Sequence, residues 1–129
     1  MFTSNRDFRM WDFNVSHSQL LIRSPRSRVV STNIDIVFWG VIFVRMPAVL
    51  NGIEMAECSE DEIASLDRGL VSKSAQNKVF SVRSGINRYV IICAGVKVLE
   101  NELDIFDSSL EYFAATDPTK DLGKLLFRS

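Results

Sequence analysis

The chain has 129 residues, of which 47% are hydrophobic and 24% are charged, and its formal net charge is −1 at pH 7. This composition is typical of a globular protein, and the length predicts a single domain over residues 1–129. Fifteen basic residues nearly balance sixteen acidic residues, so the chain lacks the general positive field that attracts nucleic acid or an anionic membrane surface.

The sequence also argues against membrane insertion and secretion. Residues 1–12 contain charges and aromatic rings but no continuous apolar core of a signal peptide. The apolar run at residues 36–44 is far shorter than the roughly 18 to 20 residues that a membrane-spanning helix needs. Cys58 and Cys93 are far apart and lie among small or apolar residues, which predicts buried, reduced thiols. We therefore expect a soluble, cytoplasmic protein.

The N-terminal part predicts a β-hairpin. Residues 7–15 and 19–23 are rich in apolar residues and are separated by a short polar turn. The parity of the apolar positions switches at Met10 and Trp11, which predicts a bulge in the first strand. Residues 1–6 are polar, and we expect them to be frayed.

The most hydrophobic stretch of the chain, residues 34–47, follows a loop at residues 24–28 that contains a proline. This stretch carries apolar side chains on both parities, which is typical of a strand in the middle of a sheet that is covered on both faces. We therefore expect Trp39 to be buried. Gly40 lies at the centre of the stretch and predicts a bulge or a sharp bend.

The clearest local signal is a helix start. Ser59 and Glu62 have the spacing of a capping box, in which each side chain accepts a hydrogen bond from the backbone of the other residue. The apolar positions that follow predict a short helix over residues 60–68, with Gly69 as its stop. The polar residues 71–77 predict an exposed loop.

The C-terminal half predicts further strands. Residues 78–83 alternate in polarity, and residues 88–99 form a second long apolar stretch that is interrupted by Gly95. Residues 108–113 fit a helix with a second capping box or a strand, and this alternative stays open. Residues 120–129 fit a last helical turn that docks on the domain.

The expected fold is therefore mainly β, with about six to eight strands, mostly antiparallel, and one or two short helices. A β-sandwich and a partly closed β-barrel both fit. Residues 21–24 resemble residues 81–84, and each of these segments precedes a long apolar stretch with a Gly-Val pair. Chance explains such an echo, because β-hairpins reuse the same few residue types. The alternative is two similar strand-loop-strand units, with each strand paired to the next one.

No constellation of residues predicts catalysis, a metal site or a cofactor. His17 is the only histidine, which excludes a site of several histidines, and its place in a polar turn is typical of a surface residue. The cysteines lack C-x-x-C spacing, and the chain has neither a glycine-rich phosphate loop nor a dinucleotide fingerprint. The acidic cluster at residues 57–62 is typical of a solvated helix start.

Two sets of residues are candidates for binding. Arg23, Arg26 and Arg28 crowd the loop after the first hairpin and would suit a phosphate or an acidic protein partner. Four aromatic residues would line a ligand cavity if the fold were a hollow barrel. These aromatic residues are Trp11, Phe13, Trp39 and Phe43.

The leading functional hypothesis is a non-catalytic protein-interaction module, comparable in size and class to a bacterial immunity-type protein that neutralises a toxin. The alternative is a β-barrel that binds or acts on a small apolar ligand. An enclosed cavity lined by tryptophan would favour the ligand barrel, whereas a solid core would favour the interaction module. Self-association through a strand at the sheet edge is a further expectation.

Overall fold

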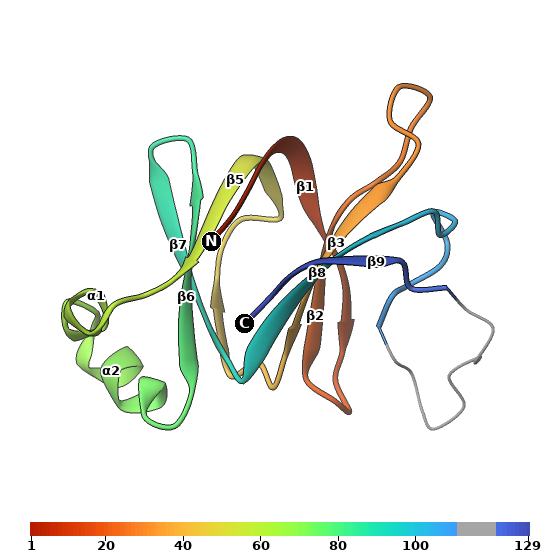
Figure 1. The fold of residues 1–129 in the computed structure, drawn as a ribbon. Coiled ribbons are helices and arrows are strands. Elements are labelled where there is room, and N and C mark those ends of the chain that lie inside the picture. The colour runs from red at the N-terminus through yellow and green to blue at the C-terminus, as the bar shows by residue number, and fades with distance from the viewer. Residues whose placement is uncertain (111–120) are drawn as a thin grey trace.

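The computed structural model describes residues 1–110 and 121–129. These residues form one antiparallel sheet of nine strands and two short helices (Figure 1). The strands are β1 (Phe2–Asn14), β2 (Gln19–Ser24), β3 (Asn33–Trp39), β4 (Phe43–Arg45), β5 (Val49–Glu57), β6 (Lys78–Ser84), β7 (Asn87–Cys93), β8 (Gly95–Asn101) and β9 (Lys124–Arg128). The expected mainly β, antiparallel fold with short helices is confirmed.

The sheet has the strand order β4-β7-β6-β5-β1-β2-β3-β8-β9, and it curls around its own core. At Gly40, with φ of +59°, the chain turns out of β3 toward β4, while β7 continues through Ala94 into β8. The Ala94 N–H donates to the Trp39 carbonyl at 2.9 Å, so the two bends lie against each other. The sheet therefore has the form of a β-sandwich or a partly open barrel.

The predicted bend at Gly40 is confirmed, but the prediction of one central strand over residues 34–47 is wrong. Residues 34–47 do not form one central strand, because β3 pairs with β2 and β8 whereas β4 pairs with β7 at the first position of the strand order. The positive φ of Gly40 is a conformation that glycine adopts without strain. An added Cβ there would also lie 2.8 Å from the Ala94 Cβ, so only glycine fits this bend well.

Two similar meanders make up most of the sheet. In one meander β1 pairs with β2 and β2 with β3, and in the other β5 pairs with β6 and β6 with β7. The pairing of β1 with β5 joins them. As expected, β3 pairs with the preceding β2 and β7 with the preceding β6. Residues 88–99 do not form one strand, however, because the chain bends at Ala94 and β8 pairs with β3.

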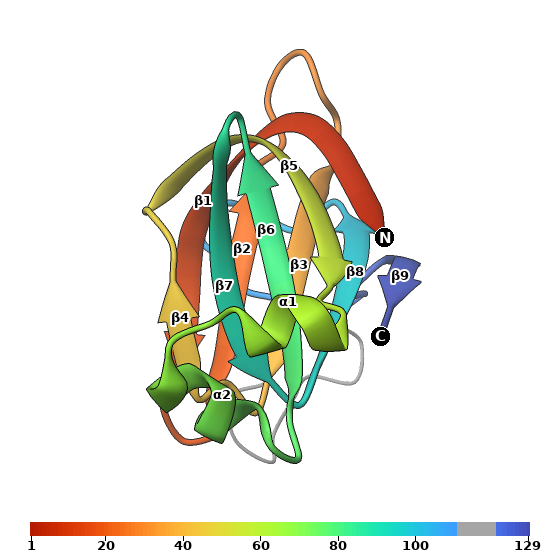
Figure 2. The same cartoon turned by 90° about the vertical axis from the view of Figure 1, so that its left-hand side faces the viewer.

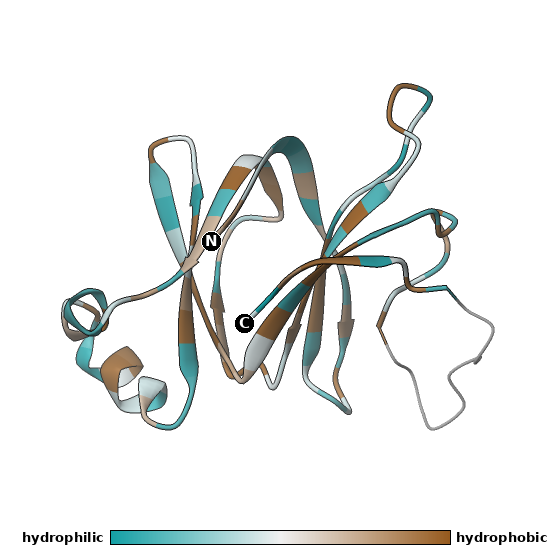
Figure 3. Cartoon of the chain, viewed as in Figure 1, coloured by the Kyte–Doolittle hydropathy of each residue, from teal (hydrophilic) through white to brown (hydrophobic). Residues whose placement is uncertain are grey.

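Side chains fill the space that the sheet encloses. Phe8, Phe38 and Phe80 are completely buried there, and the rings of Phe38 and Phe80 meet edge to face with centroids 6.2 Å apart. Hydrophobic residues are frequent on β3 and β8, which lie side by side as an antiparallel pair (Figure 3). Trp39 has the opposite parity to Phe38 and is only half-buried, so the expectation that Trp39 belongs to the core is wrong.

The two helices lie outside the sheet, beside β6 and β7 (Figure 2). Helix α1 (Glu60–Ala64) begins with the predicted capping box, in which the Glu62 N–H donates to Ser59 Oγ and the Ser59 N–H donates to Glu62 Oε1. Helix α1 ends at Ala64, before the expected residue 68, and helix α2 (Arg68–Ser74) includes Gly69, the expected stop, together with most of the expected loop at residues 71–77. The reason is Leu70, which is buried against the outer face of the sheet, because burial of an apolar face stabilises short helices more than local propensity does.

A substitution at Ser59 tests whether the capping box stabilises helix α1. Replacing Ser59 with alanine leaves the Glu62 N–H without its side-chain acceptor, so we expect the free energy of unfolding to fall by about 1 kcal/mol. Ser72→Ala is a matched control, because Ser72 is exposed inside α2 and alanine favours a helix interior. Urea unfolding measures both variants, and equal midpoints for the two would contradict the capping role.

The chain ends differ from the expectation. Residues 1–6 are not frayed, because β1 begins at Phe2 and pairs with β5. The bulge predicted near Met10 is confirmed by a register shift between Met10 and Asp12. The C-terminal residues form β9 instead of a helical turn, and of residues 108–113 the last three lie outside the described residues. Across residues 1–110 and 121–129, no helix is long and apolar enough to cross a membrane.

Both cysteines are free and buried, as expected. Burial raises the pKa of the Cys93 thiol to about 12, and reactivity requires the thiolate. We expect Cys93 in a Cys58→Ser variant to react with a thiol reagent only as fast as the protein unfolds. Ellman's reagent in native and denaturing buffer measures this, and rapid labelling of the native variant would show that the thiol is accessible.

Candidate functional site

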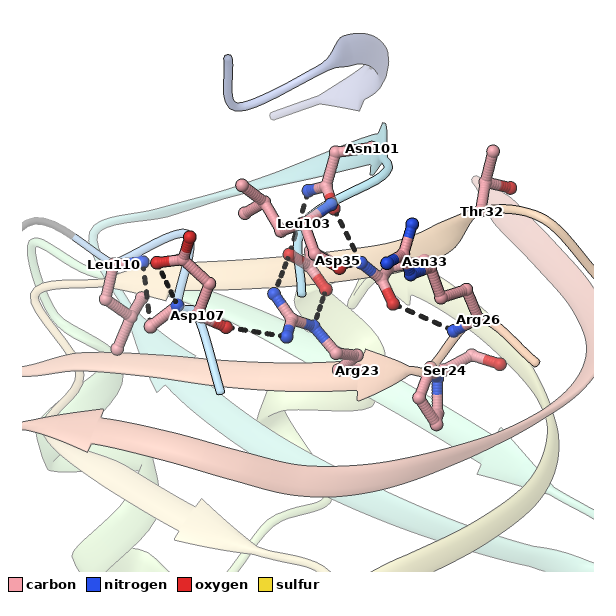
Figure 4. Close-up of polar contacts among 12 residues, drawn as sticks. Arg23, Ser24, Arg26, Thr32, Asn33, Asp35, Asn101, Leu103, Asp107 and Leu110 are labelled. Carbon is pink, nitrogen blue, oxygen red and sulfur yellow. Dashed lines mark hydrogen bonds and ion pairs between the residues drawn. The ribbon is translucent and has the colours of Figure 1, made fainter. Parts of the chain in front are cut away.

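The outer face of β2, β3 and β8 carries a buried polar network. Arg23 on β2 lies directly opposite Asp35 on β3. Its Nε and Nη2 donate to Asp35 Oδ1 and Oδ2 at 2.6 and 2.8 Å, and both side chains have no exposed surface. This is a two-pronged ion pair, the geometry in which arginine binds a carboxylate most strongly (Figure 4).

Two asparagines extend the network. Asn33 on β3 and Asn101 on β8 are cross-strand neighbours, and Asn33 Nδ2 donates to Asn101 Oδ1 at 2.9 Å. Asn101 Nδ2 in turn donates to Asp35 Oδ2 at 3.0 Å. Asn33 also fixes the loop after β2, because the Arg26 N–H donates to its side-chain oxygen. The polar groups are thus matched to one another, which is the arrangement of a structural network.

The chain after β8 covers this network. Arg23 Nη1 donates to the Asp107 carbonyl at 2.7 Å, and Leu110 packs against Leu21 and Val37. The Arg23 guanidinium also lies over the ring of Trp11, with its Cζ 5.3 Å from the ring centroid. The expectation that Arg23 lies in an exposed loop is wrong, because Arg23 belongs to β2 and its side chain has no exposed surface.

Arg26 and Arg28 do lie in a loop, residues 25–32, which we name the β2–β3 loop. This loop projects from the sheet at the upper right of Figure 1. Both arginines are exposed, and neither guanidinium has a hydrogen-bond partner or an ion pair within the described part of the chain. The neighbouring Val29 is 92% exposed. The loop therefore displays two free guanidinium groups beside an apolar side chain.

The base of the β2–β3 loop is clamped by Arg6 on β1. Its guanidinium donates to the Thr32 carbonyl at 2.6 Å and to Ser24 Oγ and the Ser24 carbonyl at 3.0 and 3.1 Å. Burial lowers the pKa of the Arg6 guanidinium, while the Glu100 carboxylate opposes this shift. Arg6 therefore joins the two ends of the loop and fixes how it leaves the sheet.

The loop also has hydrogen bonds of its own. The Ser27 N–H donates to the Val30 carbonyl at 2.7 Å, and Ser27 Oγ accepts from the N–H groups of Val29 and Val30. These bonds restrict the backbone around the two arginines. A loop that is ordered before binding loses less conformational entropy when it binds.

The four aromatic candidates do not line one interior cavity. Trp11 packs on the outer face with Leu21 and Val37, and Phe13 is 46% exposed. Trp39 lies at a hollow on the outer surface, and Phe43 packs beside the helices. The interior of the sheet is filled by other residues, among them Phe8, Met55 and Ile91.

The residues that were considered for catalysis or metal binding lie apart from one another. His17 is exposed in the turn between β1 and β2. In the acidic cluster, Glu62 caps α1 and forms an ion pair with Arg88. Within the described residues, no group of three or more histidine, cysteine, aspartate or glutamate side chains could hold a metal ion.

We compared the chain with models of protein families, with curated proteins and with solved structures. No family model matches it, and neither a curated protein nor a solved structure shows significant similarity to it.

Proposed function

We propose that this protein is a non-catalytic interaction module that binds an acidic surface of another protein through the β2–β3 loop. The observation that supports this most is the loop itself, which is held in place by Arg6 and displays the free guanidinium groups of Arg26 and Arg28. Arginine is enriched among the residues that dominate binding energy at protein interfaces. Val29, 92% exposed, adds an apolar contact beside the charges.

The core also supports this proposal over a ligand-binding barrel. A barrel that encloses a small apolar ligand needs a cavity of several hundred Å³. Here Phe8, Phe38 and Phe80 occupy the interior without any exposed surface. The proposal includes a cytoplasmic setting, which the free thiols of Cys58 and Cys93 favour. Neutralisation of a toxin, as by an immunity-type protein, is one role that such a module would fill.

Self-association through a sheet edge is a weaker candidate. The terminal strands of the order are β4 and β9. Charged residues on edge strands oppose pairing with another chain, and β4 carries Arg45 while β9 carries Lys124 and Arg128. We therefore expect the partner to be a different protein.

Capture from an extract of the native organism tests the proposal with three baits. The first bait is the wild-type protein, and the second carries Arg26→Glu and Arg28→Glu. The third bait carries Arg68→Glu and Lys73→Glu, two exposed positions of α2 that match the charge change away from the loop. We expect a specific protein on the first and third baits and its loss from the second. Equal recovery on all three baits would contradict binding through the loop.

A further inference from the structure

A hollow in the outer surface lies at the other end of β2 and β3 from the β2–β3 loop. It has a volume of about 330 Å³, and its lining includes His17, Gln19, Trp39, Lys97 and Arg128. This volume is within the range of about 300–1,000 Å³ that is typical of small-molecule sites. No carboxylate belongs to the lining, whereas two of its side chains, Lys97 and Arg128, are cationic.

The two cations face each other across a strand pair. Lys97 on β8 is the register partner of Arg128 on β9. Side chains at directly opposite positions have Cβ atoms only about 4.5–5.5 Å apart, and like charges placed there destabilise a sheet. Neither cation has an ion pair with any of the described acidic residues. An anion between them would relieve this repulsion.

The Arg128 guanidinium is already oriented. It lies over the ring of Trp39, with its Cζ 5.3 Å from the ring centroid. Trp39 in turn rests on Gly95, where an added Cβ would lie only 2.2 Å from Trp39 Cζ2. The missing side chain of Gly95 thus allows the indole to lie flat beneath Arg128. A guanidinium held in this way keeps its N–H groups available for an oxyanion.

Gln19, a residue of the lining, carries a buried acceptor without a donor. Gln19 Oε1 is inaccessible to solvent and accepts no hydrogen bond from the described residues. Buried polar atoms without partners are rare in native structures and are costly. Gln19 lines the hollow and is only half-buried as a whole residue, so a turn of its side chain would bring Oε1 to a ligand hydroxyl, and the hydrogen bond from that hydroxyl would remove this cost.

We infer that the hollow is a binding site for a small hydroxylated oxyanion, namely the phosphate ester of a small polyol. Its phosphate lies between Lys97 and Arg128, and a hydroxyl group donates to Gln19 Oε1. The site is separate from the β2–β3 loop, so its existence does not depend on the proposed protein interaction.

Titration with glycerol 3-phosphate, inorganic phosphate and glycerol tests this inference. The readout is the NMR shift of the Trp39 indole N–H, with the Trp11 indole N–H as an internal reference. We expect saturable binding of glycerol 3-phosphate, weaker binding of inorganic phosphate and no binding of glycerol. Absence of a saturable Trp39 shift with millimolar glycerol 3-phosphate, or an equal shift with glycerol, would overturn the inference.

Variants separate the roles of the lining residues. Lys97→Gln and Arg128→Gln should each weaken binding of glycerol 3-phosphate at least about tenfold, which corresponds to 1.4 kcal/mol. Gln19→Leu should remove the preference for glycerol 3-phosphate over inorganic phosphate. The control Lys124→Gln changes an exposed lysine on β9 outside the hollow and should leave the affinity within about twofold, because exposed charges are largely screened. If Lys124→Gln weakened binding of glycerol 3-phosphate as much as Lys97→Gln does, the assignment of the hollow as the binding site would be wrong.

Thermal unfolding provides a second measurement that does not depend on ligand affinity alone. Without ligand and at low salt, Lys97→Gln should raise Tm, because it removes the repulsion from Arg128. Glycerol 3-phosphate should raise the Tm of the wild type more than that of Lys97→Gln, because the variant binds it at least about tenfold more weakly. A lower Tm of the unliganded variant would show that Lys97 has a structural role and would contradict the inference.

Discussion

Replacing Asp35 with asparagine is expected to lower the free energy of unfolding by about 3–5 kcal/mol, because it leaves the charge of Arg23 buried without a counterion. Arg23 has no exposed surface and donates to both Asp35 oxygens. Asparagine keeps the size of the side chain, so the loss reports the charge and not a cavity. Urea unfolding monitored by circular dichroism measures the change.

Two controls separate this effect from a general cost of losing an ion pair. The double variant Arg23→Met with Asp35→Leu removes both charges, and we expect it to be much more stable than Asp35→Asn, because apolar residues can replace a buried pair at little cost. Asp67→Asn breaks the exposed pair with Arg45, whose atoms are 3.7 Å apart, and should cost less than about 1 kcal/mol. A similar small loss for Asp35→Asn would contradict the burial of Arg23.

Phe38→Ala is the second change with a large expected effect. Phe38 is completely buried and meets the ring of Phe80, so its truncation should cost about 3–5 kcal/mol through lost burial and a cavity. Trp39→Ala is the matched comparison, because Trp39 is the next residue of the same strand but is half-buried on the outer face. We expect it to be less destabilising by at least about 1 kcal/mol. If Trp39→Ala cost more than Phe38→Ala, the assignment of the two faces of β3 would be wrong.

The parts of the fold that were predicted correctly depend on local chemistry. The capping box of Ser59 and Glu62 requires only four residues, and the bend at Gly40 follows from the conformational freedom of one glycine. The bulge near Met10 follows from a switch in the parity of apolar positions. Each of these features can be recognised without knowing which segments meet in space.

The predictions that the structure contradicts concern features that depend on contacts between distant segments of the chain. Arg23 is placed in the interior by the chain after β8, whose Asp107 carbonyl lies 84 positions further along. The alternation within a strand indicates which residues share a face, but it does not show what covers that face. One signal was present, because Asp35 is a lone acidic residue in an apolar strand and would be costly to bury unless a cation faced it.

The binding loop was predicted only in part for the same reason. The density of basic residues identified Arg26 and Arg28, which the structure leaves exposed. The clamp by Arg6 was not foreseen, because Arg6 reaches the loop across the pairing of β1 with β2. Likewise, the hollow beside Trp39 requires β2, β3, β8 and β9 to be neighbours in the sheet.

The rate of association with the captured partner tests the proposed function most directly. We expect Arg26→Glu with Arg28→Glu to slow association at least about tenfold at low salt and much less at high salt, because electrostatic attraction mainly controls the association rate and is screened by salt. The matched variant of α2, Arg68→Glu with Lys73→Glu, should associate as fast as the wild type. Equal association rates for the wild type and the loop variant at low salt would contradict an interaction through the β2–β3 loop.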